Sequence, residues 1–411
     1  AAPAPSAEPP PSDPRIAADL ASFDMVWQRV ADTFYDPRYG GVDWKAVRAE
    51  LRPKILETKT REEARAIMRQ AIERLRVSHF VVSGPLEEDS EEAAGEQAGV
   101  GIELRILDRA VVVTRIDAGS PADRAKLPLG AELASVDGVA LAPRLAAVVE
   151  ELGASSLVPL SQARSVRRLI HGKPGTKVVL GVAAGAKVRL VTLERAAAGK
   201  VASLGNLGSH RVVYEARKLD GQVGYIRLSM FLDPPAILPA FARDLAGFRD
   251  TAGVIIDLRG NPGGLGAMAM GMAGHLISEE NKKLGTMRTR DTSLDFVVNP
   301  QAERYAGKVA ILIDDLSAST SEIFAGGLQD LGRARVFGRR SPGAALPSTI
   351  EQLPNGDRFQ YAIADYVSAG GKVLEGHGVV PDVPIALDLK ALRGGKDPDI
   401  VAATRWIKEK P

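Results

Sequence analysis

Apolar side chains recur at intervals of three and four positions over residues 13–84, and this spacing predicts a small helical domain. The first helix should begin at Asp13, because Asp is a favoured N-cap and Pro14 suits the first helical position. A second helix is expected from Asp43-Trp44, and Thr60-Arg-Glu-Glu is a capping box that opens a third. The predicted inward positions are Leu20, Phe23, Val26, Trp27, Val30 and Phe34 in the first helix, and Ala64, Ile67, Met68, Ala71, Ile72 and Leu75 in the third.

The pattern then shifts from helix to strand. Residues 87–96 are acidic and indicate a solvated linker. After them, short apolar runs predict a second domain, which with its linker covers residues 85–197. Residues 141–172 interrupt these runs with helical periodicity. The strands expected here cover residues 111–116 and 177–182.

Strands and helices alternate over residues 198–411, which is the pattern of a mainly parallel α/β core. Pro354-Asn-Gly356 indicates a hairpin between residues 349–353 and 359–363. The chain as a whole is therefore predicted to be multidomain, combining α+β and α/β parts. The strands expected in the core cover residues 223–228, 254–258, 308–313 and 334–337, with helices over residues 236–248, after Gly264 and after Ser319.

Composition limits the classes of function. The chain has 53 Lys and Arg against 51 Asp and Glu, so its charge gives no reason to expect a nucleic-acid partner. It has no Cys, which excludes disulfides and thiol catalysis, and no His-x-x-x-His pair. We therefore expect no metal and no cofactor. No apolar run reaches the ~18 residues of a membrane span.

Residues 1–12 are rich in Ala, Pro and Ser, and the sequence starts with Ala rather than Met. This is typical of a flexible tether left after an export signal or lipid anchor is removed. It predicts a periplasmic or secreted location, although a trimmed N-terminus would give the same sequence.

Candidate chemistry centres on residues 317–321, Ser-Ala-Ser-Thr-Ser, between a predicted strand and a predicted helix. A helix N-terminus carries unpaired N–H groups and a partial positive charge, so an exposed serine there could act as a nucleophile beside an oxyanion site. The alternative is structural, because Ser319 and Glu322 fit a capping box. By itself the segment favours the cap.

Residues 317–325 resemble the serine-nucleophile motif of the carboxyl-terminal processing (tail-specific) protease family, and residues 253–264 resemble that family's second signature. Residues 40–44 and 376–382 match further phrases of the family. The resemblance implies a helical N-terminal domain, a PDZ domain and a crotonase-like ββα protease core, with Ser319 as nucleophile. It also implies an oxyanion hole, for which we expect the amides of Thr320 and of Gly263 or Gly264.

The second domain resembles a PDZ domain, with its Gly-x-Gly-hydrophobic loop at Gly99, Val100, Gly101 and Ile102. In such domains the loop amides bind a peptide's terminal carboxylate, and the peptide adds as a strand, here beside Ile102 and Leu104. Position 131 is Ala where these domains usually carry Asp. A plain β-domain is the alternative.

The expected catalytic base differs from the one that the family usually has. Bacterial and plastid members use a lysine, and the matching position here is Ala344, which cannot accept a proton. An engineered knockout, an inactive descendant and a different base all remain open, the first being the least expected. The related tricorn-type proteases carry a Ser-His pair like Ser78-His79. That likeness implies His79 as base, with Ser78 and Glu375 orienting it, while His377 is a substitute candidate.

The function predicted from the sequence is a serine endopeptidase acting on peptides or on unfolded or tail-bearing proteins, with the PDZ domain recruiting or gating. A homo-oligomer is possible. Two alternatives remain open. One is a non-catalytic protein that uses the protease fold to bind peptides or hydrophobic ligands, and the other is a PDZ-led scaffold.

Overall fold

The computed structural model describes residues 12–85, 98–184, 187–197, 200–203, 208–220 and 222–409. The first eleven residues of the expected tether and the acidic linker lie outside these ranges. The chain forms two compact units, which are described separately. The helical unit comprises residues up to 86 together with 288–292 and 346–365, and the large unit comprises the rest. No described helix is long and apolar enough to cross a membrane.

Three helices form most of the helical unit, and all three begin where the sequence predicts. They are α1 (Pro14–Thr33), α2 (Trp44–Ile55) and α3 (Arg61–Glu73), with the short η1 (Tyr39–Gly41) between the first two. Asp13, Asp43 and Thr60 each accept a backbone N–H as N-cap. The predicted inward faces are largely confirmed. Phe23, Val30, Leu51 and Met68 are fully buried, whereas Trp27 and Ile67 are half-buried.

A hairpin from late in the chain completes this unit. The predicted hairpin forms β19 (Ser348–Gln352) and β20 (Arg358–Ala362), and β20 also pairs with β1 (Val81–Ser83). The sequence analysis had counted the hairpin with residues 198–411. The structure groups it with the helices instead, because Leu353, Phe359 and Tyr361 pack into the helical core.

Within the large unit, residues 98–197 form what we call the middle module. Its sheet has the strand order β3-β4-β5-β7-β8, with β3 at one edge. The strands of the module are β2 (Ala98–Gly99), β3 (Ile102–Leu107), β4 (Ala110–Ile116), β5 (Glu132–Val136), β6 (Val139–Ala140), β7 (Lys177–Ala184), β8 (Lys187–Glu194) and β9 (Ala196–Ala197). Its helices are α5 (Pro121–Arg124), α6 (Leu141–Leu152) and α7 (Val158–Ile170), and the last two occupy the stretch predicted as helical.

The rest of the large unit is built on a six-stranded sheet with the order β12-β13-β14-β17-β18-β22. All neighbours from β13 to β22 are parallel and β12 is antiparallel, which confirms the predicted mainly parallel core. The strands are β12 (Tyr214–Leu219), β13 (Val223–Leu228), β14 (Gly253–Asp257), β17 (Lys308–Ile313), β18 (Arg335–Gly338) and β22 (Val383–Pro384).

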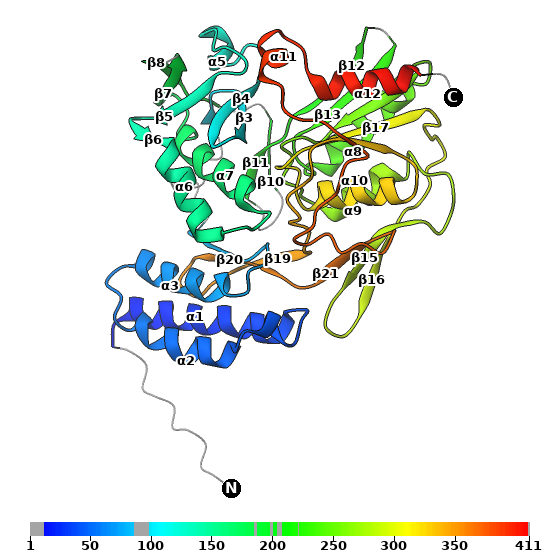
Figure 1. The fold of residues 1–411 in the computed structure, drawn as a ribbon. Helices are drawn as coiled ribbons and strands as arrows, with labels where there is room; N and C mark the ends of the chain where they lie inside the picture. The colour runs from blue at the N-terminus through cyan, green and yellow to red at the C-terminus, as the bar shows by residue number, and fades with distance from the viewer. Residues whose placement is uncertain are drawn as a thin grey trace. The chain divides into compact units, whose positions relative to one another are not determined.

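Helices cover both faces of this sheet (Figure 1). On one face, α8 (Pro234–Gly247), α9 (Gly266–Ala273) and α10 (Thr320–Asp330) enclose the main core. On the other, Ala403 and Ile407 of α12 (Pro398–Lys408) pack against the strands. The remaining elements are β10 (Val201–Ser203), β11 (Ser209–Arg211), β15 (Lys283–Arg288), β16 (Ser293–Val297), β21 (Asp365–Ser368) and α11 (Leu389–Arg393). Residues 260–264 follow β14 and residues 317–321 follow β17. Both turns therefore lie at the carboxyl ends of parallel strands, where ligand sites usually occur.

The hairpin should depend on one buried ion pair. Asp357 is fully buried and bonds to Arg65 at 2.8 and 3.2 Å. Asp357→Asn removes the fully buried carboxylate from the pair, although Arg65 also pairs with the exposed Glu62, and we expect the helical unit to lose roughly 3 kcal/mol of unfolding free energy. Urea unfolding followed by the fluorescence of Trp27 and Trp44 measures this. The exposed pair Arg249–Glu303 is the control, and Glu303→Gln should cost about 0–1 kcal/mol. Equal costs for the two variants would contradict the assignment.

Candidate active site

Buried hydrogen bonds around Asp314 shape the turn between β17 and α10. The Asp314 carboxylate accepts from the Leu316 N–H at 3.0 Å. Ser317 Oγ accepts from the Asp314 N–H and donates to the Leu258 carbonyl, each at 2.9 Å. These bonds lead the chain into Ser319 at φ 57° and ψ −118°. A non-glycine residue adopts such a positive φ only where its surroundings impose it, and such residues concentrate at functional sites.

Ser319 is the only hydroxyl residue of residues 317–321 that is not buried. Ser317, Thr320 and Ser321 are nearly or fully enclosed, and each donates its hydroxyl to a backbone carbonyl. For Thr320 and Ser321, at 2.7 and 3.0 Å, the acceptors lie in the second signature turn, residues 260–264. Those hydroxyls hold the turns together, which leaves Ser319 as the hydroxyl accessible to a reactant.

The capping box predicted for Ser319 and Glu322 is also formed. The Ser319 N–H donates to the Glu322 carboxylate at 2.9 Å and to the Ala344 carbonyl at 2.8 Å. The two interpretations of the sequence are therefore compatible. A serine hydroxyl that accepts at a helix N-terminus still has its own proton to give.

The Glu322 carboxylate accepts several hydrogen bonds in this region. The side chain is buried, and besides the Ser319 N–H it accepts from Ser341 Oγ at 2.6 Å, the Gly343 N–H at 2.7 Å and the Ala344 N–H at 2.9 Å. Burial raises the pKa of Glu322 to about 7, although the bonds from Ser341, Ser319 and Gly343 favour the ionised form. The S/T-x-x-E pattern revealed the cap, but nothing in the sequence indicated the other three donors.

Ala344 lies at the position of the family lysine and is 4% exposed. It belongs to a small apolar cluster with Leu316 and Ala318 of the nucleophile turn and with Leu160 and Ala163 of α7. Its contribution to the site is therefore made by its amide and carbonyl, which bond to Glu322 and to the Ser319 N–H.

Glu375 and its neighbour Gly376 bond to the turn at residues 343–345. The Glu375 carboxylate accepts from the Ala345 N–H at 3.0 Å, and the next residue, Gly376, donates its N–H to the Gly343 carbonyl at 2.8 Å. His377 is exposed, and its Nδ1 lies 2.9 Å from the Glu375 carbonyl. The predicted residues Ser319 and Glu375 are thus connected through the backbone of residues 343–345.

Gly263 and Gly264 lie against the nucleophile turn with φ of 104° and 132°. A Cβ on Gly263 would come within 2.7 Å of the Ser319 Cβ and 2.9 Å of the Thr320 nitrogen, so only glycine fits. The Gly263 N–H already donates to Asn261 Oδ1 at 2.9 Å. Within the described ranges, the Gly264 and Thr320 amides donate no hydrogen bond, and these two are better candidates for an oxyanion hole.

Asn261 was missed by the sequence analysis. It is fully buried, and its Nδ2 donates to the Leu228 carbonyl at 2.8 Å while its backbone carbonyl accepts from Ala318 N–H and Ser321 Oγ. A single asparagine therefore attaches the glycine turn to both β13 and the nucleophile turn. Its place in the Gly-Asn-Pro-Gly-Gly sequence was the available signal.

Ser78 and His79 belong to the helical unit. Ser78 Oγ lies 2.7 Å from His79 Nδ1, and His79 has a positive φ of 62°. A hydroxyl on Nδ1 orients the ring and fixes which nitrogen is left for proton transfer. The pairing of His79 with Ser319 joins two separately described units and stays a prediction.

The predicted carboxylate loop precedes the edge strand β3. Gly101 has φ 76°, and a Cβ there would come within 2.1 Å of the Ser120 Cβ. Gly99 packs against His171, whose Nε2 would lie 3.1 Å from a Cβ at that position. No pattern in the sequence singles out His171, because its nearness to the loop arises only from the fold. No group of three or more His, Asp or Glu that could hold a metal occurs in the described part of the chain.

Comparison with known proteins identifies two domain families within the chain. Residues 222–385 match the model of peptidase family S41, and residues 20–73 match that of the tricorn protease C1 domain. A probable CtpA-like serine protease of Staphylococcus haemolyticus is 26% identical over 310 residues, covering 75% of this chain and 57% of the relative. One from Staphylococcus aureus is 25% identical over 316 residues, covering 75% and 56%. The chain thus spans little more than half the length of these relatives.

Solved structures share the fold. The photosystem II D1 C-terminal processing protease has a TM-score of 0.60 at 22% identity, covering 96% of this chain and 98% of that one. Mature CPAF complexed with lactacystin has 0.64 at 15%, with the same coverage. The tricorn protease has 0.51 at 18%, covering 96% of this chain and 37% of that one. Residues 222–385, which contain both signature turns, thus form a peptidase family S41 domain.

Proposed function

We propose that this protein is a serine endopeptidase in which Ser319 attacks a peptide carbonyl. The observation that carries the proposal is that Ser319, the one partly exposed hydroxyl residue of residues 317–321, directly precedes the Thr320 amide and packs against Gly263, the residue before the Gly264 amide. Amides held in this way can stabilise the oxyanion of a tetrahedral intermediate. Gly263 contributes by its lack of a side chain, since its own N–H is engaged by Asn261.

His79 is the proposed base. An imidazole can take the Ser319 proton and return it to the leaving amine, and Ser78 Oγ at its Nδ1 would hold the ring. Glu375 would complete the set by stabilising the imidazolium. Because Ala344 offers no proton acceptor, a lysine-based mechanism has no support in this chain.

We further propose that residues 13–84 are a helical domain, 85–197 a PDZ domain with its linker, and 198–411 a crotonase-like protease core. The edge position of β3 and the glycine loop before it support peptide addition beside Ile102 and Leu104. The substrates would be peptides or unfolded or tail-bearing proteins. A periplasmic or secreted location and a homo-oligomer belong to the same proposal.

One observation favours a non-catalytic binding role instead. The turn that carries the base in lysine-dependent relatives here holds an alanine in an apolar cluster. Under that alternative, Ser319 would serve only as the helix cap.

Removing Ser319 or His79 should separate the two functions. If the pair acts as a unit, Ser319→Ala and His79→Ala should each lower kcat/KM on an unfolded protein substrate by about 10³ or more, and the double variant by little more. Ser78→Ala and Glu375→Gln should cost less, because they only orient the base. A serine-directed fluorophosphonate should label Ser319 of the wild type, as located by peptide mass.

The same series contains its control. Ala344→Lys should neither raise activity nor rescue His79→Ala, because residue 344 faces the apolar cluster. The non-catalytic alternative would be established by three results together. The wild type would cleave no substrate, it would take no fluorophosphonate label, and it would bind ligand as well as Ser319→Ala does.

Glu322 should make stability depend on pH. Its pKa rises from 4.5 when exposed to about 7 in the folded protein, so over that window the folded state holds a proton that the unfolded chain has released. Its contribution is therefore fully present below pH 4.5 and is lost as pH rises through 7. Relative to Glu322→Gln, the wild type should lose about 3 kcal/mol of unfolding free energy across this range. Urea unfolding at several pH values measures it, with Glu303→Gln as the exposed control. Parallel profiles for wild type and Glu322→Gln would contradict the burial argument.

A free C-terminal carboxylate on the substrate should strengthen binding and cleavage if residues 99–102 form a carboxylate-binding loop. A test substrate with a hydrophobic C-terminal tail should bind and be cleaved better than its C-terminally amidated twin, by about tenfold or more, since a charge-assisted bond is lost. Competition binding of the two free tail peptides measures the same difference without catalysis. Equal handling of both forms would rule out carboxylate recognition.

A further inference from the structure

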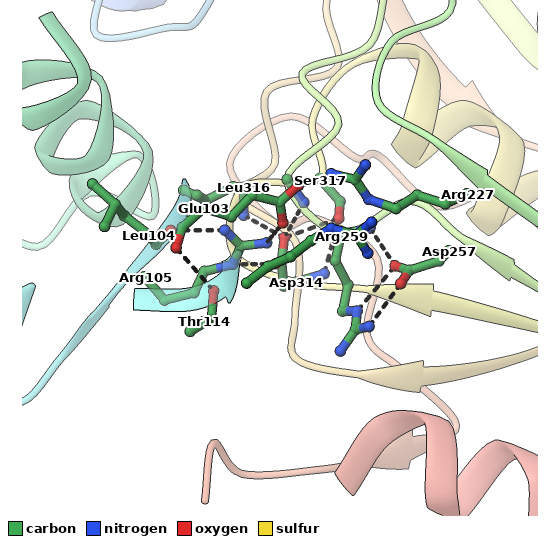
Figure 2. A network of polar contacts seen from close by, with 12 residues as sticks. Glu103, Leu104, Arg105, Thr114, Arg227, Asp257, Arg259, Asp314, Leu316 and Ser317 are labelled. Carbon is green, nitrogen blue, oxygen red and sulfur yellow. Dashed lines mark hydrogen bonds and ion pairs between the residues drawn. The ribbon is translucent and has the colours of Figure 1, made fainter. Parts of the chain in front are cut away.

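Ion pairs from β3, β4 and the residue after β4 join the middle module to the rest of the large unit, and each side of this contact carries both signs of charge. Glu103 and Arg105 of β3 pair with Arg227 and Asp314, and Figure 2 shows these two contacts side by side. Beyond them, the guanidinium of Arg115 holds Glu215 at 2.6 Å, and Asp117 lies 3.1 Å from Arg211. The module therefore docks in one register, because a shift along the strand would bring like charges together.

The Arg105–Asp314 pair differs from the others in what its acidic member touches. Asp314 is fully buried, and its Oδ1 accepts from the Gly260 N–H and from the Leu316 N–H, each at 3.0 Å, and lies 3.1 Å from Ser317 Oγ. Gly260 opens the glycine turn, whereas Leu316 and Ser317 open the nucleophile turn. One carboxylate therefore sets the spacing of the two turns that present Gly264, Ser319 and Thr320.

We propose that Asp314 is a positioning residue for the active site, and that Arg105 of the middle module supplies the countercharge that keeps it in place. The inference rests on the proposed peptidase function for its catalytic consequence. Its structural half, a coupling between the docked module and the two turns, stands without it.

Charge balance explains why Arg105 is needed. An ionised carboxylate that is fully buried is unstable unless a cation and hydrogen bonds compensate it. Burial alone would raise the pKa of Asp314, but Arg105 first and Arg339 second lower it below the usual range, together with the Gly260 and Leu316 amides. Arg339 is the weaker partner, at 3.7 Å from Asp314 and 3.4 Å from Asp315. Without Arg105, the ionised Asp314 carboxylate would lack its main countercharge. It could then accept from the Gly260 and Leu316 amides only at a cost in free energy.

The neighbouring Glu103–Arg227 pair of the same interface is less well compensated. Arg227 is 4% exposed, and its Nη1 has no hydrogen-bond acceptor among the described residues. Burial lowers the pKa of Arg227, Asp257 raises it and Arg259 lowers it further. A contact made of buried, imperfectly satisfied charges contributes little net stability. The Glu103–Arg227 pair therefore adds less to docking than its burial alone would suggest.

Strand geometry links this contact to the proposed peptide groove. Successive side chains of β3 point to opposite faces, so Glu103 and Arg105 lie on the face opposite Ile102 and Leu104. A peptide added at the edge of β3 would fix the strand that carries Arg105. Peptide binding would in this way favour the ordered arrangement of both turns.

A double-mutant cycle between Arg105 and Asp314 tests the coupling. The variants are Arg105→Met, Asp314→Asn and the pair, compared with a matched cycle of Arg115→Met and Glu215→Gln, which removes an ion pair of the same interface that does not touch either turn. We expect Arg105→Met and Asp314→Asn each to lower kcat by about tenfold or more with KM changed by less than about threefold, and the pair to cost little beyond either single change. The Arg115 and Glu215 variants should leave kcat within about twofold.

Unfolding in urea supplies a readout that needs no activity. The Arg105–Asp314 cycle should show a coupling of about fivefold or more in the unfolding equilibrium constant. Strictly additive effects in unfolding would overturn the inference, as would kcat values equal to those of the Arg115–Glu215 cycle. Arg105→Lys keeps the charge and should restore most of kcat, which provides a test if Asp314→Asn does not fold. An inactive wild type would defeat the proposed function alone, since the unfolding cycle still decides the coupling.

Discussion

The geometry of the candidate site depends on the buried carboxylate of Glu322. It accepts from the Ser319 amide, from Ser341 and from the Gly343 and Ala344 amides, so the start of α10 and the turn at residues 341–345 meet on two oxygens. No cation takes part in these contacts. A carboxylate held only by neutral donors remains costly to ionise, and this is why the pKa of Glu322 is raised whereas that of Asp314, paired with Arg105, is lowered. The two acids flank Ser319 in sequence and hold opposite sides of its turn.

This contrast has a consequence for how the protein balances stability and activity. The ionised form of Glu322 matches its four donors best, since a proton on either oxygen would face a group that also donates. The arrangement that organises Ser319 is therefore the one that burial disfavours. Strained or destabilised groups of this kind are retained where function needs them, and the positive φ of Ser319 is a second instance at the same place.

Local signals in the sequence predicted what local physics determines. The cap residues Asp13, Asp43 and Thr60 fixed the helix starts, and β-branched runs predicted β13 and β17 to the residue. The hairpin was predicted, but its packing against the helices was not. The periodicity of the sequence indicates that Phe359 is buried, but it does not identify the residues that bury it. The contacts of Glu322, Asn261 and Arg105 were missed for the same reason. Their distant partners lie between 19 positions away, for Glu322 and Ser341, and 209 positions away, for Arg105 and Asp314, and a single charged or amide residue carries no periodic signal.

The substitution at position 344 is easier to understand in these terms. In this chain the turn at residues 341–345 contributes through its backbone: two amides bond to Glu322, the next bonds to Glu375, and the Ala344 carbonyl accepts from Ser319. None of these bonds requires a side chain at 344, and the cluster with Leu160 and Ala163 favours a small apolar one. Under the catalytic proposal, a base for Ser319 would then come from another segment. The two histidines considered for it differ in setting, since His377 is exposed and bonded to a backbone carbonyl, whereas His79 is half-buried with a hydroxyl on Nδ1. The second setting is the one that orients an imidazole for proton transfer, and it makes His79 the residue on which the catalytic proposal depends.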